Sequence, residues 1–135
     1  MDISYPFLVQ LNQMTGESVN LAIRDVFNAV YIEHIESSHS LRMFTQVGCA
    51  VPLHCTGIGK VFLANMMEME CAEYLNVIGL PRYTENTVTN YEQLKEELAV
   101  IRREGIATDD EEMERGARCI AAPVRDLDGT LVAVV

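Results

Sequence analysis

The sequence of 135 residues contains no tryptophan, four cysteines, four prolines and only ten basic residues against 20 acidic ones. Four widely spaced cysteines are too few for a disulfide scaffold, so we expect reduced thiols in a cytoplasmic protein. No hydrophobic run reaches the roughly 20 residues of a membrane span and no signal-like segment begins the chain, so no membrane partner is expected. The net charge of −10 argues against nucleic-acid binding by this segment, because such binding relies on Lys and Arg.

What is present is the composition of one globular domain, 49% hydrophobic and 22% charged. Helical spacing predicts helices over 5–14, from 57 onward, over 66–78 and over 91–104, and alternation predicts strands over 17–24, 29–36, 41–45, 106–109 and 130–135. The almost unbroken hydrophobic run over 117–124 predicts a buried strand. Hairpins mixed with helices in this order predict an α+β fold, a mainly antiparallel sheet flanked by helices.

The stretch Val51–Ala64 has the pattern of a short strand that turns directly into a helix. Thr56 is a typical N-cap, and Gly57 and Gly59 then fall in the first helical turn, whose N–H groups lack intrahelical partners. Glycine allows a ligand to approach these N–H groups closely, and the helix dipole favours an anion there. We therefore predict a carboxylate-sized anion at this helix start. The alternative is that the glycines only permit tight packing of the helix against the sheet.

Asp109 ends a predicted strand, close to where the strand of Cys119 would pair back. Its carboxylate could accept a hydrogen bond from a ligand hydroxyl or position a water, and a turn or cap aspartate is the open alternative. His54 and Cys55 could form a nucleophilic pair, but no third group at recognisable spacing would orient them. The cysteines and histidines also lack zinc-like spacing, so the sequence predicts no enzyme, no metal site and no cofactor.

Several motifs follow one another in a recognisable order. They are 15–19, 41–43, 52–60, 105–112, 116–124 and Asp126. Together they resemble the C-terminal effector-binding domain of the IclR family of bacterial transcriptional regulators. Segments 29–32 and 41–44 are most similar to KdgR-type members, which control sugar-acid use. Arg125 departs from the family, which usually has an aromatic residue or histidine at this position.

The resemblance implies a GAF-like regulatory domain over 1–135 that forms homodimers or tetramers and binds a small organic acid, a 2-keto acid or a sugar acid. The N–H groups of Gly57 and Ile58 would hold the effector carboxylate, with Asp109 and Cys119 at the polar end and Met43, Val51 and Ala117 along the apolar wall. The family's N-terminal winged helix-turn-helix is expected to lie outside these residues and to be the only part that binds DNA. The last strand is expected to be cut short, which would leave the pocket incomplete. Two alternatives are an oligomerisation module without a working pocket and a cysteine-dependent enzyme on a GAF-like scaffold.

Overall fold

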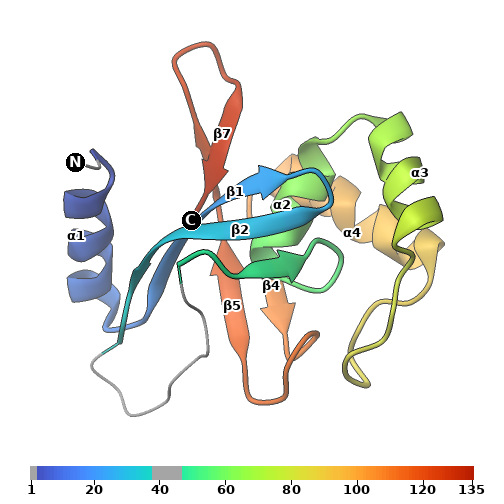
Figure 1. The fold of residues 1–135 in the computed structure, drawn as a ribbon, viewed down its shortest axis with the longest axis horizontal. Coiled ribbons are helices and arrows are strands. Elements are labelled where there is room, and N and C mark those ends of the chain that lie inside the picture. Colours follow the sequence, from blue (N-terminus) through green and yellow to red (C-terminus); the bar gives the residue numbers. More distant parts are fainter. Residues whose placement is uncertain (1–2, 38–46) are drawn as a thin grey trace.

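The computed structural model describes residues 3–37 and 47–135 of the chain (Figure 1). The elements are α1 (Tyr5–Thr15), β1 (Val19–Asp25), β2 (Asn28–Ile35), β3 (Ala50–Pro52), α2 (Gly57–Asn65), α3 (Glu68–Val77), α4 (Tyr91–Glu104), β4 (Ala107–Asp110), β5 (Arg118–Ala121), β6 (Pro123–Arg125) and β7 (Leu131–Val134). Five strands form an antiparallel sheet in the order β3-β2-β1-β7-β6, and β4 pairs antiparallel with β5 in a separate sheet. The predicted α+β class with a mainly antiparallel sheet is confirmed.

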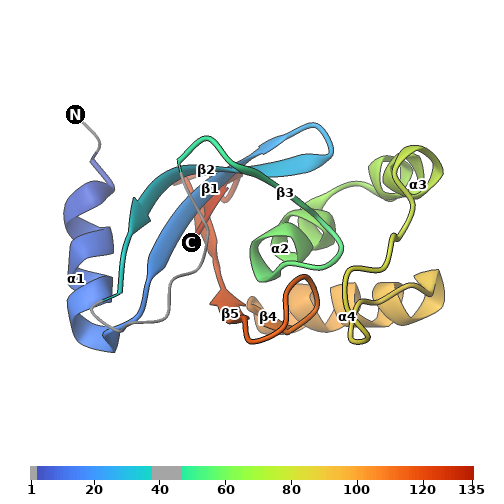
Figure 2. The ribbon, with the colours of Figure 1, turned by 60° about the horizontal axis from the view of Figure 1, so that its bottom comes forward.

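The helices lie on opposite sides of the long β1–β2 hairpin. Figures 1 and 2 show α1 on one side and α2, α3 and α4 on the other. Because successive residues of a strand point to opposite faces, β1 contributes to a core on each side, and its pairing with β2 shifts register between Leu21 and Ala22. Leu21 packs in the small core under α1, and Ala22 packs in the main core against α2.

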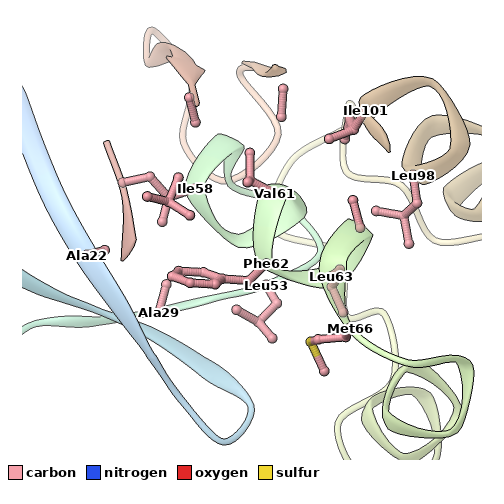
Figure 3. Close-up of a cluster of buried hydrophobic side chains, with 14 of the residues drawn as sticks. Ala22, Ala29, Leu53, Ile58, Val61, Phe62, Leu63, Met66, Leu98 and Ile101 are labelled. Carbon is pink, nitrogen blue, oxygen red and sulfur yellow. The ribbon is translucent and has the colours of Figure 1, made fainter. Parts of the chain in front are cut away.

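The main core is centred on α2, of whose nine residues eight are buried. A helix that is apolar on all sides is expected in the interior of a domain rather than on its surface. Figure 3 shows Phe62 pointing from α2 toward Ala29 on the sheet, with Leu98 and Ile101 of α4 on the other side of α2. The sheet and α4 therefore hold α2, and with it the predicted anion site, between them.

The run over 117–124 is not one buried strand, and that prediction is wrong. The run divides at Ala122 into β5 and β6, and Ile120 is 69% exposed. The reason is that β5 pairs with β4, while β6 belongs to the five-stranded sheet and pairs with β7. Ala122 marks the crossing point, where its backbone exchanges two hydrogen bonds of 2.9 and 3.0 Å with Val135. Each strand of the run therefore has its own partner and only part of its side chains inside.

The helix expected over 66–78 is shorter, Glu68–Val77, because Met67 has an extended backbone and serves as its N-cap. The strand expected over 41–45 lies outside the described residues. None of the helices in the described part of the chain is long and apolar enough to cross a membrane.

Candidate functional site

The N-terminus of α2 has the geometry that the sequence predicts. Thr56 is extended, and its hydroxyl oxygen accepts a hydrogen bond of 2.9 Å from the N–H of Gly59 while donating one of 2.8 Å to the carbonyl of Pro52. The N–H of Lys60 donates to the carbonyl of Thr56. The N–H groups of Gly57 and Ile58 have no hydrogen-bond partner among the residues that the structure describes, although both residues are buried. Buried backbone amides without a partner are rare in proteins.

The two glycines of this turn have different surroundings. A Cβ on Gly59 would lie 2.4 Å from the Cα of Leu53, so only glycine fits there and close packing explains this residue. A Cβ on Gly57 would instead lie 3.4 Å from the Cβ of Ala121 and 3.8 Å from the carbonyl oxygen of Ala107, which is ordinary contact. The packing alternative therefore accounts for Gly59 and leaves Gly57 next to the β4–β5 pair.

The β4–β5 pair brings the predicted polar residues together. Asp109 and Cys119 are directly opposite each other in its register, as the sequence predicts. Alternation places these two on the inward face, while Thr108 and Ile120 point outward and are exposed. Ala117 lies two residues before Cys119, is half-buried, and accepts a 3.0 Å hydrogen bond from the N–H of Glu111 at its carbonyl.

Asp109 is a buried carboxyl group with one oxygen engaged. Its Oδ1 accepts a hydrogen bond of 2.9 Å from the N–H of Glu112, and Oδ2 has no partner within the described part of the chain. Burial raises the pKa of Asp109 to about 6, and the negative charge of Glu112 adds to this rise, while the Glu112 N–H and Lys60 oppose it. The group therefore changes protonation near neutral pH and can present either an acceptor or a donor.

Tyr31 of β2 belongs to the same site, although the sequence analysis did not single it out. Tyr31 packs in the same buried cluster as Ile58, Ala107 and Ala121. The pKa of its hydroxyl is raised to about 12, mainly by burial and also by the charges of Cys119 and Asp109. Its backbone is bonded to Cys49 and Gly48, but the hydroxyl has no partner in residues 3–37 and 47–135. The only available sequence signal was its inward position two residues after Ala29.

The predicted apolar wall is described only in part. Val51 is 7% exposed, pairs with Ala29 in the sheet and packs in the same core as Ile58. Met43 lies outside the described residues. Four of the predicted residues, namely Gly57, Ile58, Asp109 and Cys119, thus come from the start of α2 and from the adjoining β4–β5 pair, and Ala117 directly precedes β5.

Comparison with known proteins identifies the family. The description "Bacterial transcriptional regulator IclR C-terminal" matches residues 1–135. The chain belongs to the IclR family. The transcriptional regulator KdgR of Dickeya chrysanthemi is 40% identical over 124 residues, which are 92% of this chain and 41% of that protein. The chain spans about half the length of the curated relatives that it matches.

Solved structures of IclR-type proteins have the same fold. The crystal structure of the Thermotoga maritima IclR is 41% identical with a TM-score of 0.92, and the match covers 98% of this chain and 54% of that one. An IclR homologue of Microbacterium hydrocarbonoxydans, crystallised with 4-hydroxybenzoate, is 26% identical with a TM-score of 0.90, and the match covers 97% and 54% of the two chains. The resemblance seen in the motifs is therefore confirmed.

In this IclR-type domain the thiols of Cys55 and Cys119 are poor nucleophiles at neutral pH. Burial raises the pKa of Cys55 to about 12 and that of Cys119 to about 11, so both are protonated at neutral pH. Among the described residues, no three His, Cys, Asp or Glu side chains are grouped to hold a metal ion. The relatives are transcriptional regulators, in agreement with a domain that is not an enzyme.

His54 is held by neighbours other than Cys55. Its Nε2 lies 2.9 Å from the carbonyl oxygen of Pro81, which can only accept, so Nε2 carries the proton. Its Nδ1 lies 2.8 Å from the hydroxyl of Tyr74, which accepts from the N–H of Leu53 and therefore donates to Nδ1. Burial lowers the pKa of His54, which keeps the ring neutral in this chain of hydrogen bonds. His54 thus fixes the loop before α2 and is not a base for Cys55.

Two hollows on the surface of this IclR-type domain lie away from these residues. One of about 370 Å³ is lined by Ile23, Arg24, Phe62, Asn65, Met66, Glu70 and 130–132. The other, of about 500 Å³, lies between α1 and the sheet and is lined by apolar residues such as Phe7, Leu8 and Ala133. The predicted site residues line neither hollow.

Proposed function

We propose that the chain is the effector-sensing domain of an IclR-type transcriptional regulator and binds a small organic acid at the start of α2. The effector carboxylate accepts hydrogen bonds from the N–H groups of Gly57 and Ile58. The opposite end of the effector meets Asp109, Cys119 and Tyr31. Val51, Ala117 and Met43 form the apolar wall.

The observation that carries this proposal is the pair of buried N–H groups without a partner at Gly57 and Ile58 among the described residues. Leaving a buried donor unpaired costs about 1–3 kcal/mol, and a ligand that accepts from these N–H groups would remove that cost. Both amides point out of a helix N-terminus, where the dipole favours negative charge. The β4–β5 pair, which carries Asp109 and Cys119, adjoins Gly57 through Ala107 and Ala121.

The free polar groups suggest what the rest of the effector carries. A second carboxylate would be repelled by Asp109 when that group is ionised, whereas a hydroxyl can donate to its Oδ2. The Tyr31 hydroxyl can in turn donate to a keto or hydroxyl oxygen. A 2-keto acid or a sugar acid has a carboxylate at one end and such an oxygen nearby. The 4-hydroxybenzoate on the Microbacterium homologue combines the same two groups.

In the whole protein, the effector would act on transcription through a DNA-binding part beyond these residues. This chain has a net charge of −10 and no basic cluster of its own. An effector shifts an equilibrium between two arrangements of an oligomer only by its differential affinity for them. We propose that contact with both α2 and the β4–β5 pair supplies that difference in a homodimer or tetramer.

A thermal-shift screen tests the proposal. The probes are pyruvate, gluconate and 4-hydroxybenzoate, each compared with its uncharged amide. A ligand at 100 times its Kd stabilises the folded state by about 2.7 kcal/mol, which raises Tm by roughly 10 °C in a domain of this size. We expect at least one acid to raise Tm and its amide to have no effect. If none of the acids raises Tm, the proposal is wrong, and the alternative of an oligomerisation module without a working pocket is favoured.

A pair of variants at Gly57 locates the binding. Gly57→Pro removes the N–H at the first helical position, where proline is well tolerated, and the extended backbone of Thr56 suits a residue before proline. Gly57→Ala keeps the N–H and is the matched control. We expect the acid-induced rise in Tm to disappear in Gly57→Pro and to persist in Gly57→Ala. Equal shifts in both variants would place the acid elsewhere.

A further inference from the structure

A buried ion pair links α2 to the turn that follows Asp109. Lys60, in the first turn of α2, is 1% exposed. Its Nζ lies 2.9 and 2.8 Å from the two carboxylate oxygens of Glu112 and 3.1 Å from Oε1 of Glu97 on α4. Glu112 is 7% exposed, so the Lys60–Glu112 pair is removed from water.

Glu112 contacts the Asp109 turn through its backbone as well as its side chain. Its N–H donates to Oδ1 of Asp109 at 2.9 Å, and its Oε2 accepts from the N–H of Asp110 at 3.2 Å. Its carbonyl accepts a hydrogen bond from the hydroxyl of Thr87. Hydrogen bonds to Asp109, Asp110 and Thr87 thus fix the position of Glu112, and its N–H engages one of the two carboxylate oxygens of Asp109.

Stability alone is a poor reason for this arrangement. A buried ion pair often contributes less than hydrophobic side chains of the same volume, because both charges must leave water. The positive charge of Lys60 also lies near a helix N-terminus, where the dipole disfavours a cation. The pair does fix the position of Glu112, since Lys60 donates hydrogen bonds to both of its carboxylate oxygens within one helical turn of Gly57.

We propose that Lys60 and Glu112 are positioning residues of the effector site. The pair holds the turn over 109–112 against the first turn of α2. The Glu112 N–H then occupies Oδ1 of Asp109, and Oδ2 is left for the effector. This inference rests on the proposed function for the role of Oδ2 in binding the effector. The geometry that it assigns to Asp109 can nevertheless be measured without any ligand.

The measurement is an NMR titration of the ligand-free chain. It follows the side-chain carboxyl carbon of Asp109 and the backbone amide of residue 112 as the pH changes. The titratable groups near Asp109 are Glu112, Asp110, Lys60 on α2, Cys119 on β5, Cys55 before α2 and Tyr31 on β2. Because the amide donates to the carboxyl group, both signals should show the same midpoint in the unchanged chain.

The decisive variant is Lys60→Met combined with Glu112→Gln, which removes both charges of the pair; Glu97, the other partner of Lys60, keeps its carboxylate, whose side chain is 35% exposed. We expect the variant to fold, and the titration shift of the amide at residue 112 to fall to less than half. Glu97→Gln is the matched control, because it removes the other partner of Lys60 without touching the Asp109 turn. In this control the amide should still follow Asp109.

The outcomes separate this inference from the proposed function. An amide at residue 112 that follows Asp109 equally well in the double variant overturns the positioning role. A double variant that does not fold also overturns it, since the pair would then be needed for the fold itself. Failure of every acid in the thermal-shift screen would instead overturn the proposed function and leave the titration result unchanged.

Discussion

Asp109 is the residue whose ionisation most directly links the proposed site to stability. Burial raises its pKa from 3.8 to about 6, so the folded chain binds this proton more tightly than the unfolded chain does. Stability from this group is therefore fully present below about pH 4 and is lost as the pH rises through 6. Two pKa units correspond to about 3 kcal/mol.

Replacing this carboxyl group should remove that pH dependence. The asparagine side chain of Asp109→Asn can still accept from the N–H of Glu112, but it has no charge to desolvate. We expect the stability of the variant relative to the unchanged chain to increase by up to about 3 kcal/mol between pH 4 and pH 7. Urea unfolding at the two pH values measures it.

Asp110→Asn is the control for this change. Asp110 is the next residue of β4, but its side chain is 70% exposed and pairs with Arg118 at the surface. Exposed ion pairs contribute little to stability, so this variant should differ from the unchanged chain by less than about 1 kcal/mol at either pH. A constant difference for Asp109→Asn at both pH values would contradict the raised pKa.

The thiols provide a second prediction at the scale of single residues. With a pKa of about 11, Cys119 is ionised in only about one molecule in a thousand at pH 8, and Cys55, at about 12, in fewer. In a Cys49→Ser background, iodoacetamide should therefore label both at least a hundredfold more slowly than it labels the chain unfolded in urea. Mass spectrometry of the labelled peptides measures the rates. Rapid labelling of either thiol in the folded chain would contradict the raised pKa values and favour the alternative of a cysteine-dependent enzyme.

The two glycines at the start of α2 differ in role, because Gly59 is required for packing and Gly57 is not. A Cβ on Gly59 would meet the backbone of Leu53 at 2.4 Å, and backbone cannot move aside cheaply. We expect Gly59→Ala to destabilise the chain by about 3 kcal/mol or more. Gly57→Ala meets only ordinary contacts and gains helix propensity, so its effect should stay within about 1 kcal/mol. Urea unfolding of both variants measures this difference, and equal losses would mean that both glycines serve packing.

Local sequence signals predicted the elements that depend on local chemistry. Thr56 is the N-cap of α2 as predicted, and α4 covers the predicted range 91–104. The closeness of Asp109 to the strand of Cys119 was also predicted, because strands that follow one another in the sequence often pair. These features require no knowledge of distant parts of the chain.

Long-range pairing is what the sequence could not supply. The run over 117–124 contains no signal that its halves pair with different strands, since both halves are apolar. Tyr31 could not be recognised as a site residue either, because Ala107 and Ala121, which share its buried cluster, are far away in the sequence. The Lys60–Glu112 pair spans 52 positions and was hidden for the same reason. The assembled site is thus a tertiary property built on locally predictable elements.

At the scale of the whole molecule, the two sides of the sheet are unequally packed. The main core contains 20 buried residues, but the core under α1 contains only Leu8, Val19, Leu21 and Ala133 among the described residues. Leu8 is the one buried residue of α1, while Phe7 and Met14 are 68% and 75% exposed. Elements with few buried contacts open locally at lower free energy than the core does. In the 135-residue chain, α1 should therefore exchange its amide hydrogens much faster than α2.

Substituting Leu8 tests whether α1 is an independent unit. Leu8→Ala removes most of the apolar side chain that holds α1 on the sheet, at a local cost of about 2–3 kcal/mol. We expect hydrogen exchange to accelerate throughout α1 while the amides of α2 and the proposed effector site keep their protection, as measured by mass spectrometry. Met14→Ala, whose side chain is 75% exposed and lines neither hollow, should leave both patterns unchanged. Loss of protection in α2 as well would show that the two cores are coupled, so that a change under α1 would reach the N–H groups of Gly57 and Ile58.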